Sequence, residues 1–394
     1  MGGPCLRPVT MFRSSLAFLL LALGACTTAT SSDPASTDSQ NQTAAEEETF
    51  LPNWATPAEE AIESSAPYPA ARLASAAPNA GYHVPAEYEP VQTVVMTWTG
   101  STSVLAGIGV AAAKAGAQVW MVGGPRSITG IPADHYKAVS LGYDSIWMRD
   151  YGPFGYNAQT GEMAIVDTTY RHHAVRTRDD AMSCELADLM GASCAKTPLI
   201  IDGGNYMTDG QGNVFVTRRI YDWNANMTED EVDGHLKAYL GATTIHKLPY
   251  AKTSSGQPAD GTGHIDMMAK LVAPCKAVVV ETPDEPFKTA TNTIADYLKN
   301  LSCGEGTYEV TRVAGWVNRG TWYTYSNSLT VNKSVIIPFY NDTAKNNAAV
   351  AAYKAVLPDY EVVGVMSEST IVQGGSIHCI TKEIPVPLPA TPAE

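Results

Sequence analysis

Residues 323–365 read YTYSNSLTVNKSVIIPFYNDTAKNNAAVAAYKAVLPDYEVVGV, and the expected architecture follows from this stretch. Apolar and β-branched residues predict two strands, Tyr323 to Val331 and Ser334 to Pro338, with a two-residue polar turn between them. An alanine-rich helix from Asp342 to Val356 and a valine-rich strand from Tyr360 to Val365 follow. Because a short turn favours an antiparallel hairpin, the segment predicts a unit of two strands, a helix and a third strand.

The same order of elements recurs along the chain, with about 50 to 60 residues per unit. The residues TDGQGN at 208–213 mark another hairpin turn of this kind. A doubly wound parallel sheet is the commoner α/β arrangement, but it does not place a hairpin in every unit. We therefore predict an α/β fold of repeated ββαβ-type units, and units of this length are of the scale at which propeller-like repetition must be considered. The other predicted elements are strands at 93–98, 118–122, 199–201, 264–272, 277–281 and 309–313, and helices at 104–117, 179–190, 228–240 and 285–301.

The first 25 residues have the composition of an export signal. They carry Arg7 and Arg13, no acidic residue, and an apolar run from Leu16 to Leu23 that is too short to span a membrane. The run ends in Leu-Gly-Ala-Cys at 23–26, which resembles the bacterial lipobox, whose cysteine is acylated. We predict a lipoprotein signal at 1–25, acylation of Cys26, and anchoring to the bacterial cell envelope through this lipid alone. An ordinary signal peptide is the alternative.

Residues 26–67 contain eight acidic residues and no basic one. This composition buries too little apolar surface to fold, so we predict a disordered acidic tether, in which Leu51 and Trp54 could still dock onto the body. The formal charge of −14 becomes −16 without the two arginines of the signal, and the tether's eight acids leave −8 on the rest of the chain. The globular body is expected at 68–390. Its charge argues against a nucleic-acid partner, which requires a basic face.

A second informative stretch, VQGGSIHCIT at 372–381, presents one thiol. Two glycines permit a tight bend, and alternation predicts a short strand from Ser376 to Thr381 that carries Cys379. Two of the seven cysteines belong to the signal region, so Cys379 is the odd member of the five that remain. An odd thiol in an exported protein is a candidate nucleophile, although a free cysteine is more often buried and structural.

The other four cysteines are expected to form disulfides, because export leads to an oxidising compartment. Four cysteines allow three pairings. We predict Cys184 with Cys194 and Cys275 with Cys303, since these partners are close in sequence.

Further polar motifs lie at the ends of predicted strands. GTGHID at 261–266 begins one of them, and side chains two apart on a strand share a face, so His264 and Asp266 should point the same way. The pair could also be a satisfied core pair or half of a metal site. WMRDYGP at 147–153 places Asp150 before a Gly-Pro turn, where it could simply pair with Arg149. Alone, none of these motifs identifies a function.

Five motifs in order are far more specific than any one of them. WMRDYGP, DGGN at 202–205, GTGHID, YSNS at 325–328 and GGSIHCIT together resemble the bacterial peptidyl-arginine deiminase and agmatine deiminase family of guanidine-modifying enzymes. The resemblance covers almost the whole body, beginning near Pro85. It implies a five-bladed α/β propeller of the pentein type, with the catalytic residues in a central pocket.

The resemblance also implies roles for the matching residues. Cys379 matches the nucleophile, His264 the general acid and base, and Asp150 and Asp266 the carboxylates that hold a planar guanidinium. Attack by the thiolate would give a covalent thiouronium, which water hydrolyses to a ureido group and ammonia. Asn327 matches a residue that orients the sulfur or the substrate. No metal and no organic cofactor is needed.

Two side chains beside these residues are also assigned. Trp147 is expected to wall the pocket and to stack on the guanidinium or its alkyl stem. His378 precedes Cys379 on the predicted strand, so its side chain should point to the opposite face. We therefore predict a structural role for His378.

The expected substrate depends on the basic residues that follow Tyr170. In the peptidyl-arginine branch of the family, arginines after a tyrosine bind a C-terminal carboxylate, and Arg171 or Arg176 could do so here, although their spacing differs. Together with export, this favours arginine in peptides or proteins, which would become citrulline. Agmatine, which would become N-carbamoylputrescine, is the alternative. An amidinotransferase, a thiol peptidase and an inactive, surface-anchored binding propeller are less favoured.

Overall fold

The computed structural model describes residues 50–66, 76–77, 84–152, 154–157 and 162–386. The strands in these ranges form five sheets of three or four strands and one two-stranded sheet. In each of the five, a central strand pairs antiparallel with one neighbour and, across a helical connection, parallel with the other. These are the ββαβ units that the hairpin turns predicted. The observed architecture is a five-bladed α/β propeller.

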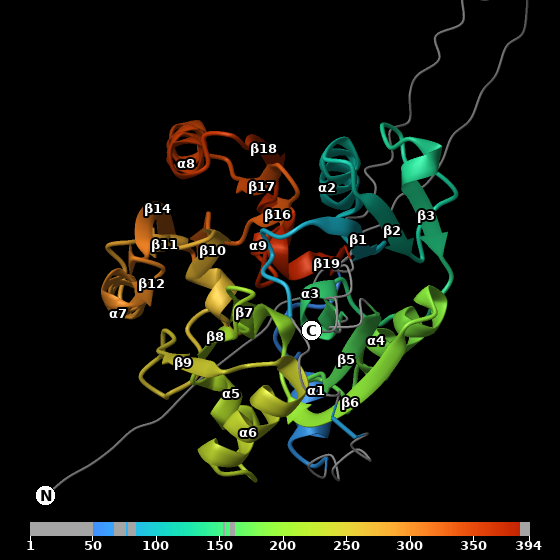
Figure 1. Ribbon diagram of the computed structural model, residues 1–394, viewed down its shortest axis with the longest axis horizontal. Helices are drawn as coiled ribbons and strands as arrows, with labels where there is room; N and C mark the ends of the chain where they lie inside the picture. Colours follow the sequence, from blue (N-terminus) through green and yellow to red (C-terminus); the bar gives the residue numbers. More distant parts are fainter. Residues whose placement is uncertain (1–49, 67–75, 78–83, 153, 158–161, 387–394) are drawn as a thin grey trace, which may run out of the picture. The chain divides into compact units, whose positions relative to one another are not determined.

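The blades follow one another around a common centre in sequence order (Figure 1). The first blade holds β1 (Val91–Thr97), α2 (Thr102–Lys114), β2 (Gln118–Val122), β3 (Tyr136–Val139) and β19 (Lys382–Pro385). The second holds β4 (Phe154–Asn157), β5 (Met163–Thr169), α4 (Thr177–Met190) and β6 (Ser193–Ile200). The third holds β7 (Met207–Thr208), β8 (Asn213–Thr217), α5 (Arg219–Trp223), α6 (Glu229–Leu240) and β9 (Thr244–Leu248).

The last two blades lie next to each other on the orange and red side of Figure 1. The fourth holds β10 (Ala269–Ala273), β11 (Lys276–Glu281), α7 (Phe287–Asn300), β14 (Glu309–Asn318) and β15 (Thr321–Thr324), with the small β12 (Ser302–Cys303) and β13 (Gly306–Thr307). The fifth holds β16 (Leu329–Val331), β17 (Ser334–Phe339), α8 (Thr343–Val356) and β18 (Glu361–Met366).

The C-terminal strand closes the ring. β19 returns to the first blade and pairs antiparallel with β1, with Val91 opposite Pro385 and Val95 opposite Lys382. Because the two ends of the described body share one sheet, the blades cannot separate without breaking this ladder. Closure also holds the preceding segment, which carries Cys379, at the centre.

Local chemistry explains why several helices begin where the sequence predicts. The Thr228 hydroxyl and the Glu231 carboxylate form a capping box at the start of α6, and Gly241 ends that helix in the left-handed region. The Asp342 side chain accepts from the Lys345 amide at the start of α8.

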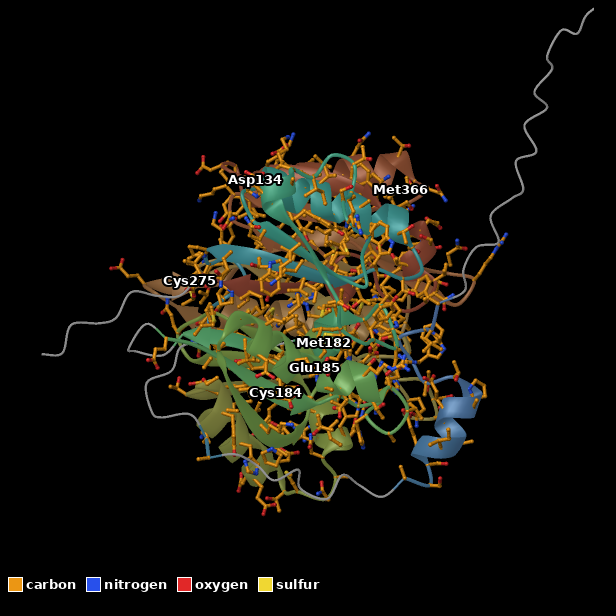
Figure 2. All side chains as sticks on the ribbon, turned by 90° about the vertical axis from the view of Figure 1, so that its right-hand side faces the viewer. Asp134, Met182, Cys184, Glu185, Cys275 and Met366 are labelled. Carbon is orange, nitrogen blue, oxygen red and sulfur yellow. A yellow bond between two sulfur atoms is a disulfide. The ribbon has the colours of Figure 1, made fainter. Side chains whose placement is uncertain are left out.

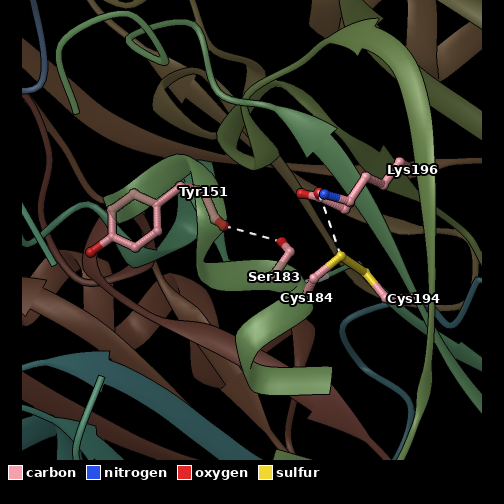
Figure 3. The surroundings of a disulfide bond; sticks show 6 residues. Tyr151, Ser183, Cys184, Cys194 and Lys196 are labelled. Carbon is pink, nitrogen blue, oxygen red and sulfur yellow. Dashed lines mark hydrogen bonds and ion pairs between the residues drawn. A yellow bond between two sulfur atoms is a disulfide. The ribbon is translucent and has the colours of Figure 1, made fainter. Parts of the chain in front are cut away.

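Both predicted disulfides are confirmed. Cys184 on α4 is bonded to Cys194 on β6, which ties the helix of the second blade to its outer strand (Figure 3). Cys275, in the turn between β10 and β11, is bonded to Cys303 on β12, within the fourth blade. Figure 2 labels one cysteine of each pair, Cys184 and Cys275, on separate blades. Cys379 is the free cysteine among the described residues.

Three predicted strands are wrong: one at its start, one in its middle and one throughout. The strand expected from His264 begins only at Ala269, because residues 265–267 form a short 3-10 helix, η3. The strand expected from Tyr323 to Val331 is two strands of different blades, β15 and β16, with an irregular link between them. The strand expected from Ser376 to Thr381 is instead a 3-10 turn, η4 (His378–Ile380).

The predicted tether is also wrong over its last part. Residues 50–66 are folded within the same compact unit as the propeller, and helix α1 spans Pro57–Glu63. The signal, Cys26 and the rest of the tether lie outside the described residues. Among the residues that are described, no helix is long and apolar enough to cross a membrane.

Candidate active site

Each link from one blade to the next carries a candidate residue to the centre of the ring. In Figure 1 the first link, α3, lies near that centre. The links are α3 (Met148–Tyr151) with Asp150, η2 (Gly203–Asn205) preceded by Asp202, η3 (Ile265–Met267) with Asp266 and its N-terminal neighbour His264, the 325–328 segment with Asn327, and η4 with Cys379. The propeller therefore brings together residues that are up to 229 positions apart (379 − 150).

Cys379 is fully buried. Asn327 Nδ2 donates to its sulfur at 3.1 Å, and the thiol lies 3.5 Å from Asp266 Oδ2. Burial, followed by the negative charges of Asp266 and Asp150, raises the pKa of the Cys379 thiol well above its ordinary value. This shift favours the protonated thiol, and a nearby positive charge would be required to favour the thiolate.

The Asn327 side chain fixes the turn that carries Cys379. Its Oδ1 accepts from the backbone amides of Ser376 at 3.0 Å, His378 at 3.1 Å and Cys379 at 3.3 Å. The preceding Gly374 has φ of 105°, a region that favours glycine. One amide side chain therefore shapes the turn and contacts the sulfur.

His264 lies between two carboxylates. Its Nε2 is 3.2 Å from Asp202 Oδ2, and its Nδ1 is 3.5 Å from Asp150 Oδ1. Burial lowers the pKa of His264, but the charges of Asp150 and Asp202 outweigh burial and leave it raised. Burial, assisted by Asp202, raises the pKa of Asp150 to about 6 against the opposing charges of His264 and Arg171.

The Asp266 carboxylate is hydrogen-bonded to His378. Its Oδ2 accepts from His378 Nδ1 at 2.7 Å, and His378 Nε2 is 2.7 Å from Glu87. Burial pushes the pKa of Asp266 upward, but the bond and charge from His378 outweigh it, so the pKa lies below its ordinary value. The prediction that His378 points away from the site was wrong, because strand alternation does not apply to a 3-10 turn.

Two glycines allow the polar groups at the centre to approach the backbone closely. A Cβ on Gly204 would lie 2.5 Å from His264 Nδ1, 2.8 Å from Asp150 Oδ1 and 3.2 Å from Asp266 Oδ2. A Cβ on Gly375 would lie 2.6 Å from Cys379 Sγ and 3.0 Å from the Trp147 ring. Within the described part of the chain, His264 Nδ1 and Asp266 Oδ1 are buried without a hydrogen-bond partner. Asp266 Oδ1 is therefore available to accept a hydrogen bond from a small cation.

The two predicted substrate-binding arginines are already engaged. Arg171 Nε lies 3.0 Å from Asp202 Oδ2, and its guanidinium also donates to Asn53. Arg176 is fully buried and donates through Nε and Nη2 to the two oxygens of Glu59, at 2.9 and 3.0 Å. Both guanidinium groups therefore have acidic partners within the chain itself.

Trp147 is buried beside Cys379 and donates through Nε1 to the Leu51 carbonyl at 2.9 Å. Two contributors were missed from the sequence. Asp202, in the DGGN motif, contacts His264, and Asn53, in the presumed tether, donates to Asp150 Oδ2 at 3.0 Å. The DGGN motif directly follows a strand and could have revealed Asp202. Nothing in the local composition indicates Asn53.

A metal ion is one ligand to consider. Ligand atoms of Asp150, Asp202 and His264 lie within 4.8 Å of one another. Each of these residues already contacts another member of the set or Arg171. The same carboxylates would equally attract an organic cation.

A five-bladed α/β propeller of this kind has the pentein fold, and here a cysteine, a histidine and carboxylates meet at its centre. The sequence model of the Porphyromonas-type peptidyl-arginine deiminase family matches residues 83–385, which is most of the chain. The chain belongs to this family. It is a hydrolase that acts on C–N bonds of amidines.

Solved structures share the fold. The agmatine deiminase of Enterococcus faecalis superposes with a TM-score of 0.69 at 22% identity, covering 80% of this chain and 99% of that one. A candidate arginine deiminase from Porphyromonas gingivalis also gives 0.69 at 22% identity, covering 77% and 98%. A Streptomyces avermitilis relative, named as a candidate agmatine deiminase, is 27% identical over 77% of this chain and 97% of its own length.

Proposed function

We propose that this enzyme hydrolyses the guanidino group of agmatine to N-carbamoylputrescine and ammonia, through a covalent thiouronium on Cys379. The observation that carries the proposal is the convergence of His264 Nδ1, Asp150 Oδ1 and Asp266 Oδ2 on Gly204, where a Cβ would lie within 3.2 Å of all three atoms. A planar guanidinium presents N–H donors in its plane, and two buried carboxylates match such a cation. The names of the relatives, agmatine deiminases among them, agree with this choice.

Agmatine is preferred over peptidyl arginine because of the two arginines. The preference for a peptide substrate depended on export and on Arg171 or Arg176 binding a carboxylate, and only the arginines bear on the pocket itself. Both are engaged by acids of the chain itself, Asp202 and Glu59. Agmatine carries no carboxylate and needs no such contact.

The first chemical step begins when the cation enters. Its positive charge beside the sulfur lowers the pKa of the Cys379 thiol, which releases its proton to solvent and becomes a thiolate. The thiolate attacks the central guanidinium carbon and forms a C–S bond. Protonated His264 gives its proton to one nitrogen, the C–N bond breaks, and ammonia leaves.

In the second step, neutral His264 takes a proton from a water molecule as that water attacks the thiouronium carbon. The C–S bond then breaks and regenerates the thiolate, and the ureido product loses its extra proton to solvent. Asp150 and Asp266 hold the positive charge throughout.

The substrate assignment is tested by comparing kcat/KM for agmatine, free arginine and a peptide that ends in arginine. Agmatine should give the highest value of the three. A higher kcat/KM for the arginine peptide would overturn the assignment and restore peptidyl arginine as the substrate.

A pH prediction follows from Asp150, whose pKa is raised to about 6. Only the ionised carboxylate attracts a guanidinium, and kcat/KM reports the protonation of the free enzyme. We expect kcat/KM for agmatine to fall as pH decreases below about 6, by roughly tenfold per unit. The measurement is a profile from pH 4.5 to 8 in buffers of constant ionic strength. A flat profile between pH 5 and 7 would contradict a role for ionised Asp150.

We also propose export and lipid anchoring at Cys26, supported by the lipobox-like LGAC at 23–26 and by two disulfides of the kind that oxidising compartments permit. Metabolic labelling with a fatty-acid analogue should mark the wild-type chain but not Cys26→Ala. Equal labelling of both would exclude this anchor.

A further inference from the structure

The N-terminal segment that precedes the family region lies over the active site. We call residues 50–66 the strap. The backbone N–H of Asn53 donates to the backbone carbonyl of Gln373 at 2.8 Å. Gln373 directly precedes the glycine pair that leads to Cys379. The Trp147 indole donates to the Leu51 carbonyl, and its ring lies 6.1 Å from that of Phe50. The strap thus contacts two of the links that form the centre.

The propeller has gaps that fit the strap. A Cβ on Gly100 would lie 2.3 Å from the Phe50 ring, one on Gly261 would lie 2.8 Å from Trp54, and one on Gly374 would lie 2.9 Å from Asn53 Cβ. Three separate loops therefore have no side chain where the strap approaches. Such a match indicates a docking surface for this segment.

One ion pair and one hydrogen bond reinforce the docking. Glu59 of α1 pairs with Arg176 through both carboxylate oxygens, and Glu63 lies 2.7 Å from His172 Nδ1. Burial raises the pKa of Glu59, but Arg176 and Thr56 outweigh it and lower the value to about 2. The acidic composition that suggested a free tether therefore serves partly to pair with buried basic groups.

The strap also reaches the position where substrate would bind. Asn53 is fully buried, and its Nδ2 donates to Asp150 Oδ2 as a guanidinium N–H would. Cys379, His264 and Asp150 are likewise fully buried beneath this arrangement. We propose that Asn53 occupies part of the guanidinium subsite in the ligand-free enzyme, so that the strap must release Asp150 before a substrate enters. The identity of the substrate, but not the masking, rests on the proposed function.

Steady-state kinetics of Asn53→Ala in the full chain test this competition. Removing the competing hydrogen bond should lower KM for agmatine about tenfold with kcat unchanged, the order expected for one hydrogen bond to a charged group. Glu60→Gln, at an exposed position of α1 in the same strap, is the matched control and should change neither constant. If Asn53 instead holds Asp150 in its productive orientation, kcat/KM will fall, and the proposal is overturned.

Alkylation of Cys379 by neutral iodoacetamide tests the masking even if agmatine is not the substrate. The label at the Cys379 peptide is followed by mass spectrometry, with Trp54→Ala as a second variant that loosens the strap. Both variants should react about tenfold faster than wild type if they shift the strap toward its open state. Loss of the Asn53 N–H leaves the negative charge of Asp150 without one hydrogen-bond donor. That change alone would raise the pKa of the Cys379 thiol and slow alkylation. A faster reaction therefore reports easier access to the thiol. Unchanged rates in both variants would refute the masking.

Discussion

Cys379→Ser is expected to abolish ammonia release, with a loss in kcat of roughly 10⁴- to 10⁶-fold, the range for removal of a catalytic nucleophile. A serine hydroxyl has a far higher pKa than a thiol, and the charge of a bound guanidinium cannot bring it into the range of catalysis. The substitution changes one buried atom, and the backbone amides of Ser376 and His378 still bond to Asn327. We therefore expect the thermal unfolding temperature to stay close to that of wild type.

Ile380→Val is the matched control for this prediction. Ile380 is buried in the same 3-10 turn, and the substitution removes one methylene without touching the polar centre. It should cost about 1 kcal/mol of stability and leave kcat within a few-fold of wild type. If Cys379→Ser retained a tenth or more of wild-type turnover, another group would have to be the nucleophile.

Asp266→Asn should produce the second-largest loss, about 2–5 kcal/mol in kcat/KM, by analogy with truncated buried charge pairs. Asp266 contacts the Cys379 thiol, and its Oδ1 lacks a partner among the described residues, so it is free to accept from a cation. An amide in this place can keep one oxygen for His378, but it then presents N–H groups to the guanidinium. KM should therefore rise and kcat should fall.

Asp342→Asn is the control, since it makes the same chemical change at the start of α8, where asparagine also caps a helix well. It should leave kcat/KM unchanged. Near-normal kcat/KM in Asp266→Asn would place the cation elsewhere in the ring.

The regular part of the propeller could be predicted because its signals are local. The Gly-rich and Asn-containing turns mark the hairpins, and the caps Thr228 and Asp342 mark helix starts to within a residue. These signals depend on neighbours in sequence. These signals therefore predict hairpins and helix starts correctly whatever the tertiary contacts of the rest of the chain.

The predictions failed where the chain enters the centre. Each wrong strand runs through a candidate residue, His264, Asn327 or Cys379, and there the backbone leaves the strand. The turn at Cys379 is stabilised by Asn327, 52 residues earlier in the chain, and no alternation pattern contains such a contact. Sequence motifs still identified these residues, because identity and order persist where secondary structure does not.

The prediction of a disordered tether failed over the strap for a related reason. Its composition is that of a tether. The prediction considered only whether the segment could fold on its own in water, and not whether it could bind to the rest of the chain. Its partners, Arg176 and His172, lie more than 100 residues away, and they convert acidic side chains into docking groups. Only the folded propeller makes this complementarity visible.

The central claim is tested most directly by product analysis of agmatine incubated with the full chain and no other amine. The account predicts one ammonia and one N-carbamoylputrescine for each agmatine consumed, and a covalent amidino adduct at Cys379 in acid-quenched samples. Agmatine left unconsumed at high enzyme concentration, or consumed without ammonia, would contradict it.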